Sequence, residues 1–166
     1  MVNFEKYIED CYLDKINLYD LQMVLGLAEL TNYLFAKKLL DIAEIYQNSD
    51  AVHLAFLIFD DYELKEEDFN ILDIFFFSWH DAHEDIIFTI SKIKNCKLVD
   101  FFHKAIFFVP DYLIEDDLKA LARKAFFGLG NNLKCPKVIE YLKEFEIGED
   151  ELLAQFSREQ LSIHML

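Results

Sequence analysis

One short segment, WHDAHED at residues 79 to 85, combines residue types that could bind a metal ion. His80, His83 and Glu84 fall within one helical turn, where side chains three residues apart share a face. No second motif supplies the remaining ligands, and Asp81 and Glu84 have the spacing of a capping box that starts a helix. We therefore expect no metal site and no cofactor, with both histidines at the surface or between helices.

Covalent and acid–base catalysis find no better support in the residue pattern. Cys96 and His103 could form a nucleophile–base pair, but no oxyanion glycine or nucleophile-specific turn surrounds the cysteine. Adjacent carboxylates such as Asp60 and Asp61 would serve acid–base catalysis only if their surroundings separated their pKa values, and nothing in the sequence indicates this. We therefore predict a binding protein and not an enzyme.

The charge of the chain favours a basic protein as partner. The formal net charge is −15, from 31 Asp and Glu against 16 Lys and Arg, and no basic patch interrupts it. Such a field repels phosphate backbones, so we expect no nucleic-acid partner, and it attracts cationic proteins. The oligomeric state stays open, and the acidity could also serve solubility alone.

Acidic residues are densest in two segments. Residues 60 to 85 hold ten Asp and Glu against the single base Lys65, and a second group follows Pro110 at residues 111 to 117. Solvated loops and first-turn acids that complement helix dipoles would explain many of them. In a stack of helical hairpins, however, successive loops align along one edge, so the two groups could form one negative surface.

Cysteine usage and the N-terminus indicate a cytoplasmic protein. Cys11, Cys96 and Cys135 are odd in number and lack paired metal-type spacing, so we expect reduced, small core residues in place of a disulfide framework or zinc cluster. The first ten residues carry charges and no apolar signal-peptide core, and no uncharged apolar run reaches the length of a membrane span. We expect neither export nor a membrane partner.

Composition and periodicity predict an all-α fold. Hydrophobic residues make up 54% of the chain, while 4 Gly and 2 Pro are too few turn signals for a sandwich or barrel. Apolar residues recur at helical spacing, which predicts helices over about 18–30, 33–47, 50–59, 66–79, 84–95, 97–109, 118–129, 136–147 and 149–162. The segment 51–59 is apolar on every side and could be a buried strand, but its helical neighbours favour a helix.

Local signals mark several helix ends. Asn17 and either Ser49 or Asp50 can cap the helices that follow them, and Pro136 suits a first helical turn. Pro110 cannot continue the helix before it. Gly130 is available as a left-handed C-cap for the helix that begins near Leu118.

A weak internal repeat suggests how the helices are arranged. A shift of about 40 residues lays Ile86 over Phe126 and Leu98 over Val138, and it aligns the helix breaks. This period fits antiparallel helical hairpins stacked as a short HEAT-like α-solenoid, with candidate repeat units at about 83–108 and 123–147. Chance similarity between two amphipathic hairpins remains the alternative. No linker interrupts the chain, so we predict a single helical domain over residues 1–166.

The second half of the chain, from Trp79 to about Phe145, resembles the HEAT-like immunity proteins of bacterial polymorphic and contact-dependent growth inhibition toxin systems. WHDAHED, the isoleucine stripe after it and DDLKALARKAFFGLG carry the resemblance. It implies a protein that binds a cognate toxin domain, often a cationic nuclease, in the cytoplasm and blocks its active site. The competing hypothesis is a helical repeat scaffold or adaptor that binds proteins without inhibiting a toxin.

Our candidate partner-binding residues come from the charge pattern and from nearby aromatic and histidine side chains. They are Asp60, Asp61, Glu63, Glu66, Glu67, Asp68, Trp79, His80, His83, Asp111, Tyr112, Glu115, Asp116 and Asp117. The acids would accelerate encounter with a basic partner, and exposed aromatic side chains would supply binding energy. Trp79 is also expected to pack into the core.

Overall fold

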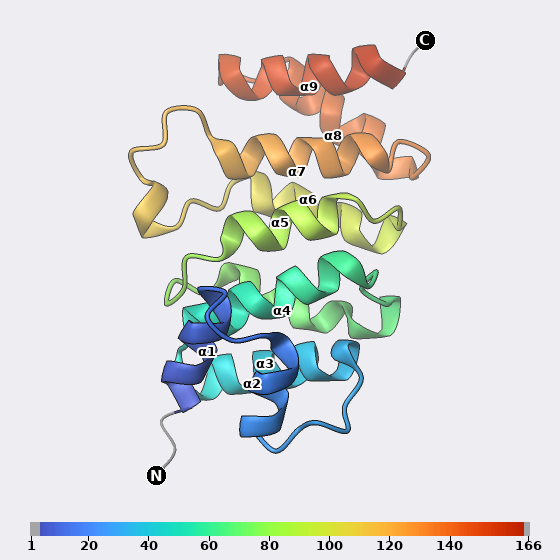
Figure 1. The fold of residues 1–166 in the computed structure, drawn as a ribbon. Helices are drawn as coiled ribbons and strands as arrows, with labels where there is room; N and C mark the ends of the chain where they lie inside the picture. The colour runs from blue at the N-terminus through green and yellow to red at the C-terminus, as the bar shows by residue number, and fades with distance from the viewer. Residues whose placement is uncertain (1–3, 165–166) are drawn as a thin grey trace. The chain divides into compact units, whose positions relative to one another are not determined.

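A computed structural model describes residues 4–164 of the chain, and all of its regular elements there are helices (Figure 1). The predicted all-α, repeat-like fold is confirmed. The structure divides into two compact units, which we call unit 1 (up to Thr89) and unit 2 (from Ile90 onward). No linker composition marks this boundary, and the single-domain assignment stays a prediction.

Unit 1 is built around a helical hairpin. Its elements are α1 (Phe4–Tyr12), α2 (Leu18–Val24), α3 (Asn32–Tyr46), α4 (Ser49–Asp61), the 3-10 helix η1 (Glu66–Phe76) and α5 (His83–Ser91), which ends two residues beyond the boundary. Helices α3 and α4 pack against each other, and α1 packs on α4 and α2. The rings of Phe35, Phe56 and Phe75 are fully buried and fill the core. The apolar segment 51–59, which could have been a buried strand, lies within α4 and is helical, as predicted.

Unit 1 confirms some predicted helix ends and changes others. The Asn17 side chain accepts a hydrogen bond from the Asp20 N–H and caps α2, as predicted, whereas Asn48 caps α4 in place of Ser49 or Asp50. The predicted helix 18–30 ends at Val24, because Gly26 adopts a φ of 70° that turns the chain.

The segment predicted as an α-helix over 66–79 is the 3-10 helix η1, ending at Phe76. Leu72 and Phe75 are both buried, and their spacing of three residues matches the three residues per turn of a 3-10 helix. Packing of these side chains on the core thus overrides the α-helical propensity of the segment.

Unit 2 contains the second set of helices. Its elements are η2 (Cys96–Leu98), α6 (Val99–Ile106), η3 (Asp111–Leu113), α7 (Ala120–Asn131), α8 (Pro136–Glu146) and α9 (Glu151–His164). Helix α7 packs on α6 and α9, and α8 packs on α9. Pro136 is the first residue of α8, as predicted.

Two glycines let the helices of unit 2 approach closely. Gly130 does not cap α7 as predicted but lies buried within it, and Asn132 follows the last turn. A Cβ atom at Gly130 would collide with the side chain of Gln160 on α9, and one at Gly128 would collide with the ring of Phe102 on α6. These glycines therefore serve helix packing and not helix termination.

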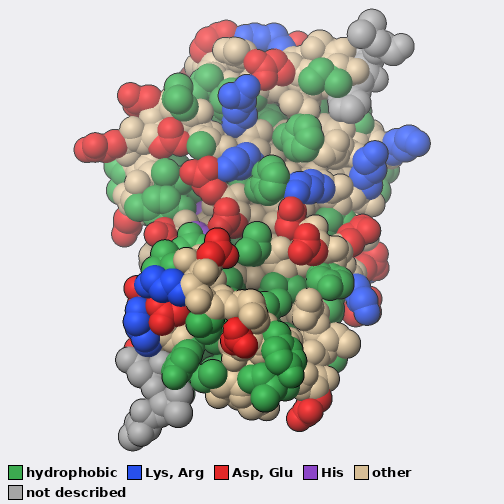
Figure 2. All heavy atoms as spheres, viewed as in Figure 1, with side chains coloured by type: hydrophobic (Ala, Val, Ile, Leu, Met, Phe, Trp, Pro, Cys, Tyr) green, Lys and Arg blue, Asp and Glu red, His purple; other side chains and the backbone are tan. Residues whose placement is uncertain are grey.

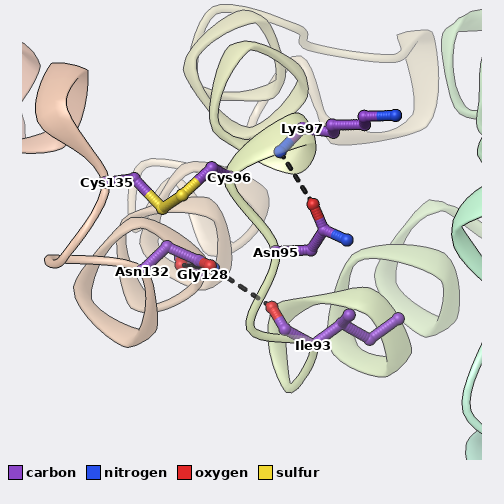
Figure 3. Close-up of a disulfide and its surroundings, with 7 residues drawn as sticks. All are labelled: Ile93, Asn95, Cys96, Lys97, Gly128, Asn132 and Cys135. Carbon is purple, nitrogen blue, oxygen red and sulfur yellow. Dashed lines mark hydrogen bonds between the residues drawn. A yellow bond between two sulfur atoms is a disulfide. The ribbon is translucent and has the colours of Figure 1, made fainter.

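A disulfide joins Cys96 to Cys135, with their Cα atoms 5.4 Å apart (Figure 3). The expectation that all cysteines are reduced is wrong for this pair, whereas Cys11 is a free, buried thiol as expected. Counting cysteines could not show that η2 and the start of α8 meet in space. The side chain of Asn132 reinforces this junction by donating to the Ile93 carbonyl at 3.1 Å, as Figure 3 shows.

Candidate functional site

The acidic residues that follow α4 divide into exposed and buried groups. Asp60, Asp61, Glu63, Glu66 and Glu67 are exposed, whereas Asp68 is only 8% exposed. Glu63 and Glu67 line an open hollow that Tyr33, Lys37 and Lys65 share. Because Lys37 and Lys65 also line the hollow, its net charge is less negative than its acidic residues alone would make it.

Asp68 anchors η1 to α3. Its carboxylate accepts hydrogen bonds from the Tyr33 hydroxyl at 2.7 Å and from the Lys37 ammonium at 2.5 Å. Burial alone would raise the pKa of Asp68, but these two donors hold the pKa below its usual value. Burial also raises the pKa of Tyr33 to about 12, so the phenol stays protonated. Asp68 therefore stabilises unit 1 and is not available at its surface.

His80 and His83 lie inside unit 1, and their rings stack with centroids 4.2 Å apart. The Nε2–H of His80 donates to the Ile74 carbonyl at 2.8 Å, and the Nε2–H of His83 donates to the Phe77 carbonyl at 3.0 Å. Burial lowers the pKa of both side chains, that of His83 to about 4, so both are neutral at pH 7. They hold the end of η1 and offer a partner no exposed surface.

Trp79 is half-buried beside this pair, with its indole edge-on to the His80 ring at 5.0 Å. It is thus neither a fully buried core residue nor a freely exposed anchor. Within residues 4–164, no group of three or more His, Cys, Asp and Glu side chains is arranged to hold a metal ion.

A histidine that the sequence did not single out connects three helices of unit 1. His53 on α4 contacts Asp85 through Nδ1 at 2.6 Å and Asp81 through Nε2 at 3.1 Å, and the Tyr12 ring of α1 stacks on it at 5.0 Å. Burial lowers the pKa of His53, but the hydrogen bonds with the two carboxylates outweigh burial and raise the pKa overall. Asp81 and Asp85 lie 28 and 32 residues from His53, so no local pattern could reveal the cluster.

This cluster has the residue types of a catalytic triad but not the geometry. The hydroxyl of Ser49 donates to the Asp81 carboxylate at 2.5 Å, and no hydrogen bond joins it to His53. A triad needs the histidine to accept the proton of the nucleophile. The cluster therefore links α1, α4 and the start of α5 through hydrogen bonds and ring stacking.

The second acidic group lies in the segment between α6 and α7, residues 107–119. Asp111, Tyr112, Glu115 and Asp117 are exposed there. Asp116 has a local structural role, because its carboxylate accepts hydrogen bonds from the backbone N–H groups of Leu118 at 3.1 Å and Ala120 at 2.7 Å. Asp116 therefore shapes the start of α7, and its neighbours supply the exposed charge.

The same segment exposes large apolar side chains. Phe107 is 62%, Val109 58%, Ile114 69% and Leu118 76% exposed. Figure 2 shows hydrophobic side chains next to acidic ones on the left of the view, where Figure 1 draws the segment between α6 and α7. The predicted helices over 97–109 and 118–129 include Val109 and Leu118. The structure corrects this, because both residues lie outside the helices.

Three of these side chains, Phe107, Val109 and Ile114, line a cavity of about 560 Å³ within unit 2, whereas Leu118 does not. Buried Leu121 and Leu153 form part of its lining, together with Phe107 and Ile114 from the α6–α7 segment. Three carboxylates also line it, those of Asp116, Asp117 and Asp150. The one lysine among the lining residues, Lys119, forms an ion pair with Asp150.

Most acidic members of the two predicted groups are thus exposed, whereas Asp68, His80 and His83 are buried. No helix among the residues described has the length and apolar character to cross a membrane. Comparisons of the chain with protein-family models, with curated proteins and with solved structures gave no match.

Proposed function

We propose that this chain is an immunity protein, which binds and neutralises a basic toxin domain and has no turnover of its own. The observation that carries the proposal is the segment between α6 and α7, where exposed apolar side chains alternate with exposed carboxylates. Exposed apolar groups of this size mark interaction surfaces, and the flanking charge selects the sign of the partner.

Interface energetics support this assignment of roles. Apolar and aromatic anchors such as Phe107, Tyr112 and Ile114 would supply most of the binding energy, because their burial removes large apolar areas from water. Asp111, Glu115 and Asp117 would mainly accelerate association with a cationic surface. The net charge of −15 extends that attraction over the whole chain.

The deciding experiment is purification of the tagged protein from its own host at low and moderate salt. We expect a one-to-one complex with a basic protein whose toxic activity is lost on binding. Recovery of the protein alone or only with itself at both salt concentrations would refute the immunity role.

Charge reversal tests the surface itself. The triple variant D111K, E115K and D117K should slow association with that partner at least tenfold at low salt, and less at high salt. The matched control is E140K, E144K and E149K, which makes the same change in net charge on exposed residues of the same unit. Equal slowing by both variants would show that net charge acts and not this segment.

We also propose that the protein is cytoplasmic, because a toxin that acts inside the cell must be neutralised there. The disulfide between Cys96 and Cys135 bears directly on it, because the cytoplasm keeps most thiols reduced. A cytoplasmic location requires that the bond seen in the structure is open inside the cell, so alkylation of thiols in rapidly quenched cells, followed by mass measurement, should find this pair reduced there. A fully oxidised pair in the cell would contradict a cytoplasmic location.

The second candidate is a helical scaffold or adaptor. Its specific support is a set of exposed apolar side chains on helices outside the α6–α7 segment, among them Ile45, Leu57 and Phe127. Such a protein would bind its partner with an affinity that salt hardly changes, whereas the immunity proposal requires salt-sensitive association.

A further inference from the structure

The cavity in unit 2 has features that identify the kind of partner segment it could accept. Its volume of about 560 Å³ lies inside the range, roughly 300–1,000 Å³, of pockets that enclose ligands. The lining residues Leu121, Ala122 and Leu153 are buried, so the bottom of the cavity is already shaped by the helices. Ile114 and Phe107 are exposed and would lose contact with water when the cavity is filled.

The polar groups around this cavity favour a cation over an anion. Asp117 lines the cavity and is exposed, and Asp111 and Glu115 are exposed in the same segment. The ammonium of Lys119 is already paired with Asp150, so it adds little attraction for an anionic group. A ligand with phosphate or carboxylate groups would be repelled here, and a segment with Lys or Arg would be attracted.

A second copy of this chain fits the cavity poorly as a partner. Each copy carries a net charge of −15, so two acidic surfaces would meet, and like charges placed together oppose association. The charge therefore points to a different, basic chain.

We propose that this cavity binds a short peptide segment of the partner in which one or two large apolar side chains are flanked by Lys or Arg. The apolar side chains enter between the α6–α7 segment and the lining residues Leu121 and Leu153. The flanking cations lie against Asp117 and the neighbouring carboxylates. The inference rests on the proposed function, because it specifies how the basic partner is held.

The test uses the full chain and three synthetic peptides of the same length. The first has two lysines on each side of a Leu-Phe pair, the second replaces that pair by two serines, and the third replaces the lysines by glutamates. We expect only the first peptide to bind at moderate salt, with NMR shift changes centred on the backbone amides of Leu121, Ala122 and Leu153. Equal binding of the serine peptide, or shift changes elsewhere, would overturn the proposal.

A matched pair of variants locates the binding. Ile114 lines the cavity and is 69% exposed, so I114S should leave the fold intact and weaken the first peptide about tenfold. Leu118 is 76% exposed in the same segment but does not line the cavity, so L118S should leave the affinity unchanged. Equal effects of the two variants would refute the assignment.

The outcome can be separated from that of the proposed function. If the natural partner is recovered and binds I114S as tightly as the unchanged protein, the cavity proposal fails while the immunity role stands. If no partner is recovered, the immunity role fails, and the peptide experiment still decides whether the cavity binds basic apolar segments.

Discussion

The buried imidazole of His83 makes a quantitative prediction about acid stability. The side chain is fully buried, its Nε2–H donates to the Phe77 carbonyl, and its pKa falls from 6.5 to about 4. Replacing it in the variant H83Q keeps a hydrogen-bond donor on a side chain of similar reach but removes the titration. The variant should therefore lose less stability than the unchanged protein when the pH is lowered.

The size of this effect follows from linkage between protonation and folding. Between pH 7 and pH 5 the unfolded chain binds a proton on this imidazole, with a pKa of 6.5, whereas the folded chain binds almost none. The unfolded state therefore gains stability as the pH falls, and the free energy of unfolding drops by about 2 kcal/mol over this interval. H83Q should lack this drop, even if its stability at pH 7 is lower because ring contacts are lost.

Urea denaturation at pH 7, 6 and 5 measures the effect. Trp79 is the single tryptophan, and it contacts the His80 ring, so its fluorescence reports the unfolding of unit 1. The matched control is H53Q, for which the sign is opposite. The pKa of His53 is raised by Asp85 and Asp81 despite burial, so its contribution to stability grows as the pH falls.

Relative to the unchanged protein, H83Q should therefore flatten the acid loss of stability, and H53Q should steepen it. A drop between pH 7 and pH 5 that is the same in H83Q as in the unchanged protein would mean that His83 is not neutral in the folded state. An NMR titration of the His83 ring with a midpoint near 6.5 would refute the reasoning directly.

Three further predictions concern stability. Reduction of the disulfide should lower the free energy of unfolding of unit 2, measured by urea denaturation, by about 3–4 kcal/mol, because the bridge closes a loop across a sequence separation of 39. Reductant should not change the stability of the double variant C96S and C135S. G128A should destabilise unit 2 by about 2 kcal/mol and lower its thermal midpoint, since the added methyl group collides with the Phe102 ring. D68N should lower the free energy of unfolding by about 1–2 kcal/mol at pH 7. This loss should become smaller at acid pH, because the Asp68 carboxylate of the unchanged protein is then protonated as well.

Local sequence signals predicted the features of the fold that local interactions determine. Asn17 caps α2 through its own side chain, and Pro136 begins α8 because its missing N–H has no partner in a first turn anyway. The apolar segment 51–59 needed one assumption, that helical neighbours favour a helix, and the structure agrees.

Features that depend on distant residues could not be predicted in this way. Gly130 resembles a helix stop in sequence, but it lies within α7, where an added Cβ would meet the end of the Gln160 side chain, thirty residues later. The disulfide between Cys96 and Cys135 also joins residues that are far apart in the chain, but the internal repeat is consistent with their proximity. A shift of about 40 residues places the two cysteines almost at the same point of successive hairpins, and equivalent points of neighbouring repeats lie close in space.

The same difference between local and distant information applies to the charges. Both acidic segments contain carboxylates that bind groups within the protein: Asp68 binds Tyr33 and Lys37, and Asp116 binds the backbone at the start of α7. Acid density in the sequence therefore overestimates the charge available to a partner. Mutating these two residues would destabilise the fold and weaken binding for reasons unrelated to contact. An informative test of the acidic surfaces must leave Asp68 and Asp116 unchanged and alter only their exposed neighbours.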